Sequence, residues 1–206
     1  ADFLPWPNGF SSGVEERILD CELLHCGGYL HYPAMHFGAT TQLYRRAKEL
    51  GVTTSIDTQF PLEPIGRPWI HSLKDILPYT DVLIADIDEA RAITGREDVR
   101  DCIAFLMDTG IEALVVKLGA QGSYAAGKGE VHFQESIDMG PLVDSIGAGD
   151  AYGAAFLTQY LQGSDIGECA RFASTVAGLT VTGVGGTSNM PTYEEAIKIM
   201  NKEKRI

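Results

Sequence analysis

One short run near residue 150 combines a carboxylate with residues small enough for a ligand to approach the backbone. Gly147-Ala148-Gly149-Asp150 follows a segment predicted to be extended, residues 139–144, and precedes an apolar stretch of helical periodicity at about 151–162. The first turn of a helix carries unpaired N–H groups and a partial positive charge, which together bind phosphate. A carboxylate beside such a site can accept the proton of an attacking hydroxyl. The run therefore predicts a phosphoryl-transfer site, with Asp150 as general base and the amides of Gly147, Ala148 and Gly149 as an anion hole.

The same run has a simpler interpretation, in which Asp150 only caps the helix and the glycines only turn the chain. A dinucleotide-binding fingerprint is a second alternative, suggested by Gly147, Gly149 and Gly153. Its spacing is wrong, because the third glycine stands four residues after the second instead of three, and because the run lies late in the chain. The pattern therefore argues against a nicotinamide-dependent dehydrogenase.

Four short apolar runs predict buried strands that end at one edge of a sheet. They cover residues 22–26, 52–56, 82–85 and 114–118, and Asp57, Asp86 and Gly119 follow three of them directly. Helical periodicity predicts helices at 41–50, 99–109, 151–162, 168–182 and 192–204, and residues 123–133 predict a hairpin that turns at 127–129. This alternation predicts a single three-layer α/β/α domain with a mostly parallel sheet, which binds ligands beyond the carboxyl ends of its strands.

Composition restricts the partners and the compartment. The chain has 206 residues and a net charge of −12, which argues against nucleic acid or an anionic membrane as a partner. A nucleotide stays compatible, since backbone amides and a metal ion can hold its phosphates. No apolar run of about 18 residues predicts a membrane span. Four cysteines without metal-ligand spacing, and an N-terminal stretch unlike a signal peptide, predict a cytoplasmic protein.

Segments along nearly the whole chain resemble the motifs of the ribokinase-like (PfkB) sugar kinases, in the same order. Residues 144–152 (DSIGAGDAY) are similar to the signature DTxGAGD(A/S)F, and residues 81–90 (DVLIADIDEA) to the segment that contains the NxxE motif. Residues 115–123 (VVKLGAQGS) are similar to the strand and turn vvvtlGxxG. Residues 56–59 and 180–191 are similar to the family's lDpn strand end and its late vtxxGaxxxxP turn.

The resemblance implies ATP-dependent phosphorylation of a hydroxyl on a sugar or sugar-like small molecule. It implies that Asp150 is the catalytic base and that Lys117, Gly119, Gly122 and Asp86 bind the nucleotide. It assigns Asp86 and Glu89 to the network that organises Mg²⁺ and the phosphates. It also implies a site for a monovalent cation such as K⁺, made by Asp144, Ile146, Thr180, Gly183, Gly185 and Asn189.

Two acidic positions keep alternatives open. Asp86 replaces the asparagine of the NxxE motif, which adds negative charge near the triphosphate and requires Mg²⁺ close by. Alternatively, Asp86, Asp88 and Glu89 only enrich the first turn of a helix, as the helix dipole favours. Asp57 is a candidate substrate-binding residue, or the cap of a turn.

Family members are longer than this chain at the N-terminus, where they carry further strands and a lid. We therefore expect poor water exclusion, an exposed sheet edge and self-association, for example as a homo-oligomer. A second hypothesis follows, in which the chain is a catalytically weak or inactive nucleotide-binding or interaction protein related to a sugar kinase. No residue identifies the substrate among sugars, sugar phosphates, sugar acids and nucleosides.

Overall fold

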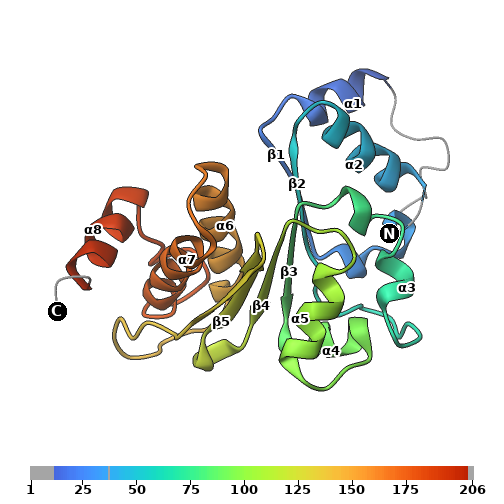
Figure 1. Cartoon of the computed structure of the whole chain (residues 1–206). Helices are drawn as coiled ribbons and strands as arrows, with labels where there is room; N and C mark the ends of the chain where they lie inside the picture. The colour runs from blue at the N-terminus through green and yellow to red at the C-terminus, as the bar shows by residue number, and fades with distance from the viewer. Residues whose placement is uncertain (1–11, 37, 204–206) are drawn as a thin grey trace. The chain divides into compact units, whose positions relative to one another are not determined.

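The computed structural model describes residues 12–36 and 38–203 (Figure 1). The sequence of residues 3–13 predicts a loop, and this segment lies almost wholly outside the described residues. The chain forms two compact units. Unit 1 comprises residues 1–116 and 126–128, and unit 2 comprises residues 117–125 and 129–206.

The sheet has six strands in the order β1 to β6. Their bounds are β1 Leu23–Gly27, β2 Thr53–Asp57, β3 Val82–Asp86, β4 Ala113–Lys117, β5 Ser123–Gly127 and β6 Glu130–Gln134. Strands β1, β2 and β3 pair in parallel, with Leu23 opposite Thr53 and Ser55 opposite Val82. The four apolar runs and the hairpin predicted from the sequence are confirmed, with strand ends shifted by about one residue.

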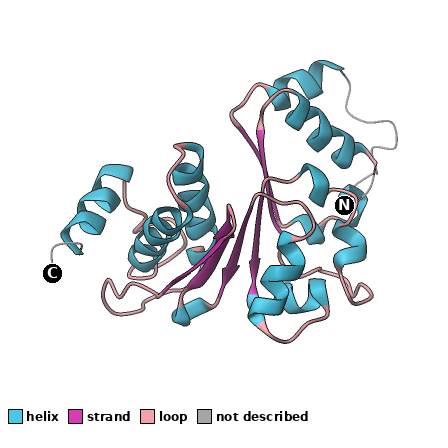
Figure 2. Ribbon diagram, in the orientation of Figure 1, coloured by secondary structure: helices cyan, strands magenta, loops and turns pink. Residues whose placement is uncertain are grey.

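In unit 1, helices alternate with strands along the chain (Figure 2). The helices are α1 Ser12–Leu19, α2 Ala39–Glu49, α3 Ile70–Leu73, α4 Ile87–Thr94 and α5 Val99–Met107. The core is built around the parallel strands, where Ile56, Leu83 and Ile84 have no exposed surface. Helix α2 packs onto this core, and the hydroxyl of Tyr44 donates to the carbonyl of Ser55 at 2.8 Å.

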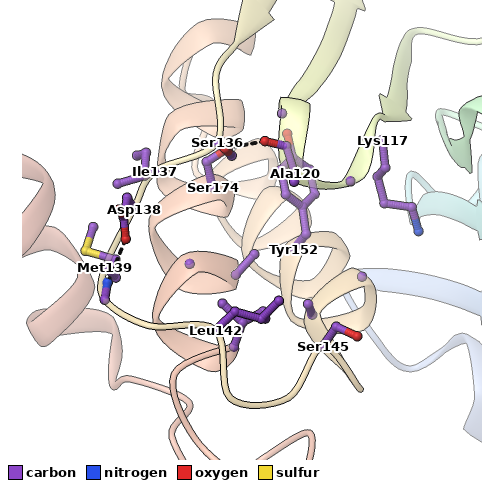
Figure 3. Close-up of a pocket in the computed structure, with 18 residues that line it drawn as sticks. Lys117, Ala120, Ser136, Ile137, Asp138, Met139, Leu142, Ser145, Tyr152 and Ser174 are labelled. Atoms are coloured by element: carbon purple, nitrogen blue, oxygen red, sulfur yellow. Dashed lines mark hydrogen bonds between the residues drawn. The ribbon is translucent and has the colours of Figure 1, made fainter.

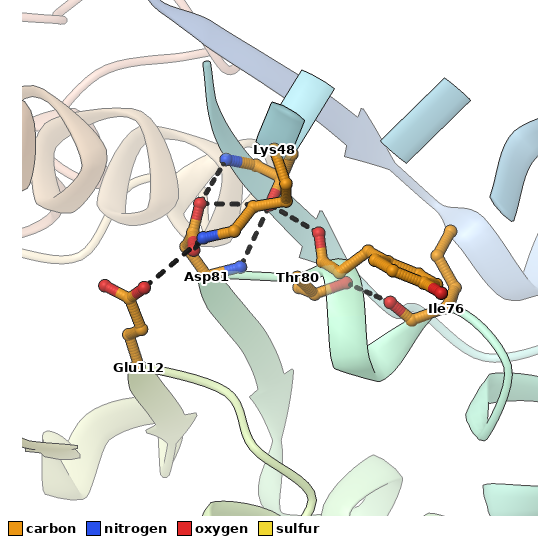
Figure 4. Close-up of polar contacts among 7 residues, drawn as sticks. Lys48, Ile76, Thr80, Asp81 and Glu112 are labelled. Carbon is orange, nitrogen blue, oxygen red and sulfur yellow. Dashed lines mark hydrogen bonds and ion pairs between the residues drawn. The ribbon is translucent and has the colours of Figure 1, made fainter. Parts of the chain in front are cut away.

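The amino ends of β2 and β3 are tied together by the buried side chain of Asp81 (Figure 4). One oxygen of Asp81 accepts hydrogen bonds from the backbone N–H of Thr54 at 2.8 Å and from its hydroxyl at 3.1 Å. The other oxygen pairs with the ammonium of Lys48, which also contacts Glu112 at 3.3 Å. Burial acts to lower the pKa of Lys48, but its bonds to Asp81 and Glu112 outweigh burial and raise it. This network fixes the end of the sheet opposite the predicted ligand edge.

Unit 2 contains helices α6 Ala148–Leu161, α7 Ile166–Thr180 and α8 Tyr193–Glu203. Helices α6 and α7 pack together through small and aromatic side chains, of which Phe156, Ala170 and Ala173 have no exposed surface. Helix α6 begins three residues before the predicted start, so the glycine run forms its first turn rather than a preceding loop. Residues 139–144, predicted to be extended, contain no strand.

Candidate functional site

The glycine run is held by close backbone packing within unit 2. Gly147 is the N-cap of α6 with φ 77°, in the left-handed region that favours glycine. A Cβ atom on Gly147 would lie 2.6 Å from the Cα of Gly186, so a side chain there would force the backbone apart. The glycine-rich turn at 183–186 therefore packs directly against the start of α6.

Asp150 is exposed in the first turn of α6. The helix is capped by Gly147, and no side chain makes a cap hydrogen bond there. The interpretation of Asp150 as merely the N-cap is therefore wrong, because the residue stands three positions inside the helix. An exposed carboxylate at this place is accessible to a ligand that approaches the helix start. One predicted anion-hole amide is partly engaged, since the N–H of Ala148 donates to the carbonyl of Ser145 at 3.3 Å.

A pocket of about 510 Å³ opens beside this turn, and all of its lining residues belong to unit 2 (Figure 3). It includes Lys117, Gly119 and Gly122, which the family resemblance assigns to the nucleotide, together with Ala148 and Gly149 of the glycine run. Its volume lies in the range typical of small-molecule sites. Much of its wall is apolar, with contributions from Ile137, Met139, Leu142 and Val181. Gly147 and Asp150 flank these lining residues in the chain.

The turn after β4 owes its shape to Gly122, which has φ 111°. A Cβ atom there would lie 2.0 Å from the carbonyl oxygen of Gln134, so no other residue fits without rearrangement. Two hydrogen bonds close the turn. The N–H of Leu118 donates to the carbonyl of Gly122 at 2.8 Å, and the N–H of Gly122 donates to the carbonyl of Gly119 at 3.1 Å. Tyr152 supports the pocket from α6, with its hydroxyl 2.7 Å from that of Ser123. Burial raises the pKa of the Tyr152 phenol, so this residue stays neutral.

In unit 1, Asp86 and Glu89 form a capping box at the start of α4. The N–H of Glu89 donates to Asp86 Oδ1 at 2.8 Å, and the N–H of Asp86 donates to Glu89 Oε2 at 2.9 Å. The buried Glu89 Oε2 also accepts a hydrogen bond from the hydroxyl of Thr58 at 2.9 Å. This geometry supports the structural interpretation of both acids, and it leaves the half-buried Asp86 as the member of the pair that a ligand can reach.

Asp57 ends β2 and is 4% exposed. Thr58, the next residue, is completely buried and bonds to neighbours on both sides. Its carbonyl accepts from the N–H of Leu30 at 3.0 Å, and its N–H donates to the carbonyl of Ile84 at 3.1 Å. The strand-end pattern identified Asp57 but not Thr58, although Thr58 lies within residues 56–59, which resemble the family's lDpn strand end.

The residues predicted to hold a monovalent cation fall into two hydrogen-bonded groups in unit 2. Asp144 accepts from the N–H of Ile146 and from the N–H of Gly185, both at 2.9 Å. These bonds lower the pKa of Asp144, and the bond from Ile146 has a larger effect than the bond from Gly185. Asn189 instead donates to the carbonyl of Leu179 at 3.1 Å. Its Cβ atom lies 2.5 Å from the position that a Cβ atom on Gly183 would occupy.

The remaining predicted member, Thr180, is buried at the end of α7, and its carbonyl accepts from the N–H of Gly183 at 3.4 Å. The structure thus brings Asp144, Ile146 and Gly185 together. It also shows a packing partner that the sequence reasoning missed, Gly186, whose signal is the glycine-rich turn itself.

Within residues 12–36 and 38–203, no group of three or more His, Cys, Asp or Glu side chains is arranged to hold a metal ion. Mg²⁺ in phosphate-transfer sites is held by one or two carboxylates together with the phosphates. Of the two acids of the capping box, the half-buried Asp86 fits such a role better, because Glu89 is buried and one of its oxygens accepts from two protein donors. None of the helices in the described ranges has the length and apolarity to cross a membrane.

A family model described as "pfkB family carbohydrate kinase" matches residues 15–193, which is most of the chain. The chain belongs to the pfkB family of carbohydrate kinases. The predicted family is thereby confirmed, and so is the predicted α/β fold.

Individual relatives of this pfkB-family chain include sugar kinases. It is 30% identical to a ribokinase of Arabidopsis thaliana over 165 residues, and this matched region covers 77% of this chain and 42% of that protein. It is 30% identical over 130 residues to a 2-dehydro-3-deoxygluconokinase of Thermoproteus tenax, which covers 63% of this chain and 40% of that protein. The chain thus spans less than half the length of these two relatives.

Among solved structures, the Arabidopsis thaliana ribokinase complexed with ribose and ATP superimposes with a TM-score of 0.78 at 26% identity, covering 95% of this chain and 61% of that one. A ribokinase II structure from E. coli in complex with ATP and Mg²⁺ superimposes with a TM-score of 0.76 at 23% identity, covering 91% of this chain and 61% of that one, and shows the shared fold.

Proposed function

We propose that this pfkB-family chain takes part in the ATP-dependent phosphorylation of a hydroxyl group on a sugar or related small molecule. One observation carries the proposal. The pocket of unit 2 combines the predicted nucleotide-binding residues Lys117, Gly119 and Gly122 with Ala148 and Gly149 of the signature. An exposed carboxylate, Asp150, stands in the same helical turn.

The pocket suits a nucleoside triphosphate because its two ends differ in character. Figure 3 shows Ile137, Asp138 and Met139 towards one end and Lys117 at the other. Apolar side chains favour a planar base, while an ammonium group and the start of a helix favour phosphate. We assign the base to the end near Met139 and the phosphates to the end near Gly149.

Asp150 acts as the general base. Its carboxylate accepts the proton of the acceptor hydroxyl while that oxygen forms a bond to the γ-phosphorus of ATP. The bond from the γ-phosphorus to the bridging oxygen breaks, and ADP leaves with the electron pair of that bond. The amides of Gly147 and Gly149, with the partly engaged Ala148, stabilise the charge on the moving phosphoryl oxygens.

The acidic residues of unit 1 have a supporting role in this proposal. When bound, Mg²⁺ neutralises charge on the β- and γ-phosphates. Asp86 is the residue we assign to that ion, and Glu89 holds the backbone of Asp86 in place through the capping box. We assign Asp57 to binding of the acceptor. We assign Asp144 and the backbone carbonyls of residues 183–185 to a site for a monovalent cation such as K⁺.

Phosphate transfer can be tested with purified chain, ATP labelled at the γ-phosphate, Mg²⁺ and K⁺, and a panel of sugars, sugar acids and nucleosides. We expect label to appear on at least one acceptor. ATP binding without transfer to any acceptor would instead favour a nucleotide-binding protein that lacks catalysis. No ATP binding at all would contradict both assignments.

A further inference from the structure

Strand β6, the outer strand of the β5–β6 hairpin, has one edge open to a further strand. Among the residues that the structure describes, β6 is the last strand of the sheet, and β5 is its neighbour on the inner side. Lys128 and Gly129 join the two strands, and their φ angles of 52° and 81° fit a type I′ turn. In such a hairpin the residues that flank the turn bond to each other, and every second residue of the outer strand points its backbone groups outward. The N–H and C=O groups of Val131 and Phe133 therefore face outward, where another strand can bond to them.

The side chains of these two residues add an exposed apolar face to the open edge. Val131 is 57% exposed and Phe133 is 42% exposed, and the ring of Phe133 contacts that of the half-buried Tyr124 with centroids 4.9 Å apart. The opposite face is covered within unit 2, where the ring of His132 lies 3.4 Å from the position that a Cβ atom on Gly167 of α7 would occupy. Natural edge strands are commonly protected by lysine or proline, but β6 (EVHFQ) contains neither.

We propose that the outer edge of β6 pairs antiparallel with β6 of a second copy of this chain, about a two-fold axis at His132. In this register Val131 of each copy stands opposite Phe133 of the other, and the outward backbone groups of each such pair exchange two hydrogen bonds. The paired side chains lie next to each other on the exposed face, so each copy covers apolar surface of the other. A shifted two-fold register would pair one of these residues with a residue outside β6.

The charges at the two ends of β6 favour a second copy as the occupant of this edge. The antiparallel register brings Lys128 in the turn of one copy beside Glu135 of the other, and the two-fold axis repeats this contact at the far end. Both residues are exposed, and the acidic Glu130 faces the neutral Gln134. Exposed ion pairs add little affinity, but opposite charges select the register. The two-fold arrangement also closes on itself, so a dimer forms rather than a fibre.

The dimer should be weak, because two five-residue strands bury less than the roughly 1,200 Å² of a stable complex. We expect a Kd on the order of 10 μM, measured by sedimentation equilibrium of the wild-type chain at about 1 to 200 μM. The inference does not depend on the proposed function, since β6 lies outside the residues that line the pocket.

Two variants test the edge itself. Val131→Pro removes an outward N–H, a change that an edge strand tolerates, and should weaken the dimer by about 10- to 100-fold because each copy loses one interfacial hydrogen bond. Phe133→Lys places a charge on the exposed face and should also weaken it by about 10-fold or more. Thermal melting followed by circular dichroism verifies that both variants stay folded.

An exchange of charges tests the register. Lys128→Glu and Glu135→Lys should each weaken the dimer by about 2- to 10-fold, and the double variant should recover the wild-type Kd to within about twofold. The matched control, Glu63→Lys, makes the same change of charge as Glu135→Lys in an exposed loop of unit 1 and should leave the Kd unchanged.

A wild-type chain that stays monomeric over this range, or one that forms an open series of polymers, would overturn the inference. A dimer whose Kd is the same in Val131→Pro and Phe133→Lys would also overturn it, since another surface would then hold the copies together. The register would be wrong, and the inference with it, if the double charge exchange failed to recover the affinity that each single change had reduced.

Discussion

Helices α4 and α6 both begin with an acidic residue three positions after the N-cap, but they use it differently. In α4 the cap is Asp86, and Glu89 turns back to the backbone, where it is 5% exposed and bonded to protein donors. In α6 the cap is Gly147, which has no side chain to offer, and Asp150 is exposed. A helix start that satisfies its own amides serves as framework, whereas one that leaves them accessible can bind an anion.

The largest expected effect lies on the open helix start. Asp150→Asn should lower kcat by about 10²- to 10⁴-fold, the usual contribution of a general base, with the Kd for ATP nearly unchanged. Steady-state kinetics with an acceptor found in the panel, together with ATP titrations, measure both quantities. Turnover in Asp150→Asn equal to that of the wild type would remove the role of base from this residue.

The closed helix start should respond in stability. Glu89→Ala removes the acceptor for the N–H of Asp86 and for the hydroxyl of Thr58, both in buried or half-buried positions. The free energy of unfolding should fall by about 2–4 kcal/mol, because buried donors are left unsatisfied. Asp150→Ala is the matched control at the same helix position and should change stability by less than about 0.5 kcal/mol. Urea denaturation followed by circular dichroism measures the difference, and similar losses in the two variants would erase the contrast between the helices.

Two glycines with nearly equal backbone angles separate crowding from conformational strain. Gly147 has φ 77° and faces the backbone of Gly186, whereas Gly163 has φ 79° and nothing within 4 Å of an added Cβ. Gly163→Ala should cost only about 1 kcal/mol, the strain of a left-handed alanine. Gly147→Ala should cost about 1–3 kcal/mol more, since the backbone must also move apart. Equal melting-curve shifts for the two variants would show that the 183–186 turn does not constrain the start of α6.

The smallest expected effect concerns Asp144, whose pKa is lowered below its usual value of 3.8 by the N–H groups of Ile146 and Gly185. A carboxyl whose folded-state pKa is depressed stabilises the fold above its unfolded pKa and loses this effect as the pH falls through the folded value. Wild type should therefore exceed Asp144→Asn in stability at pH 5 to 7, and the difference should shrink below about pH 3.8. A difference that does not vary with pH would count against this carboxylate as the link between the two segments.

Much of the framework follows from the sequence. Runs such as 82–85 and 114–118 consist largely of β-branched and aliphatic residues, the pattern of parallel strands that are buried on both faces of a sheet. The place of Asp86 and Glu89 at the start of a helix was predicted as one of two alternatives, whereas their mutual capping box was not, although their spacing matches one. The crowding of Gly147 by Gly186 was not, because it depends on the packing of residues that are far apart in the chain. The early start of α6 was missed because glycine and alanine give no amphipathic signal.

Binding of ATP observed residue by residue gives the most direct test that the nucleotide occupies the unit 2 pocket. Amide ¹H–¹⁵N spectra of the labelled chain, recorded during an ATP titration, report which backbone groups sense the ligand. We predict the largest shifts at Gly119, Gly122, Gly147 and Gly149, with smaller ones around Met139. Saturable shifts confined to the carboxyl ends of β1, β2 and β3, with the 147–150 turn unaffected, would contradict the assignment.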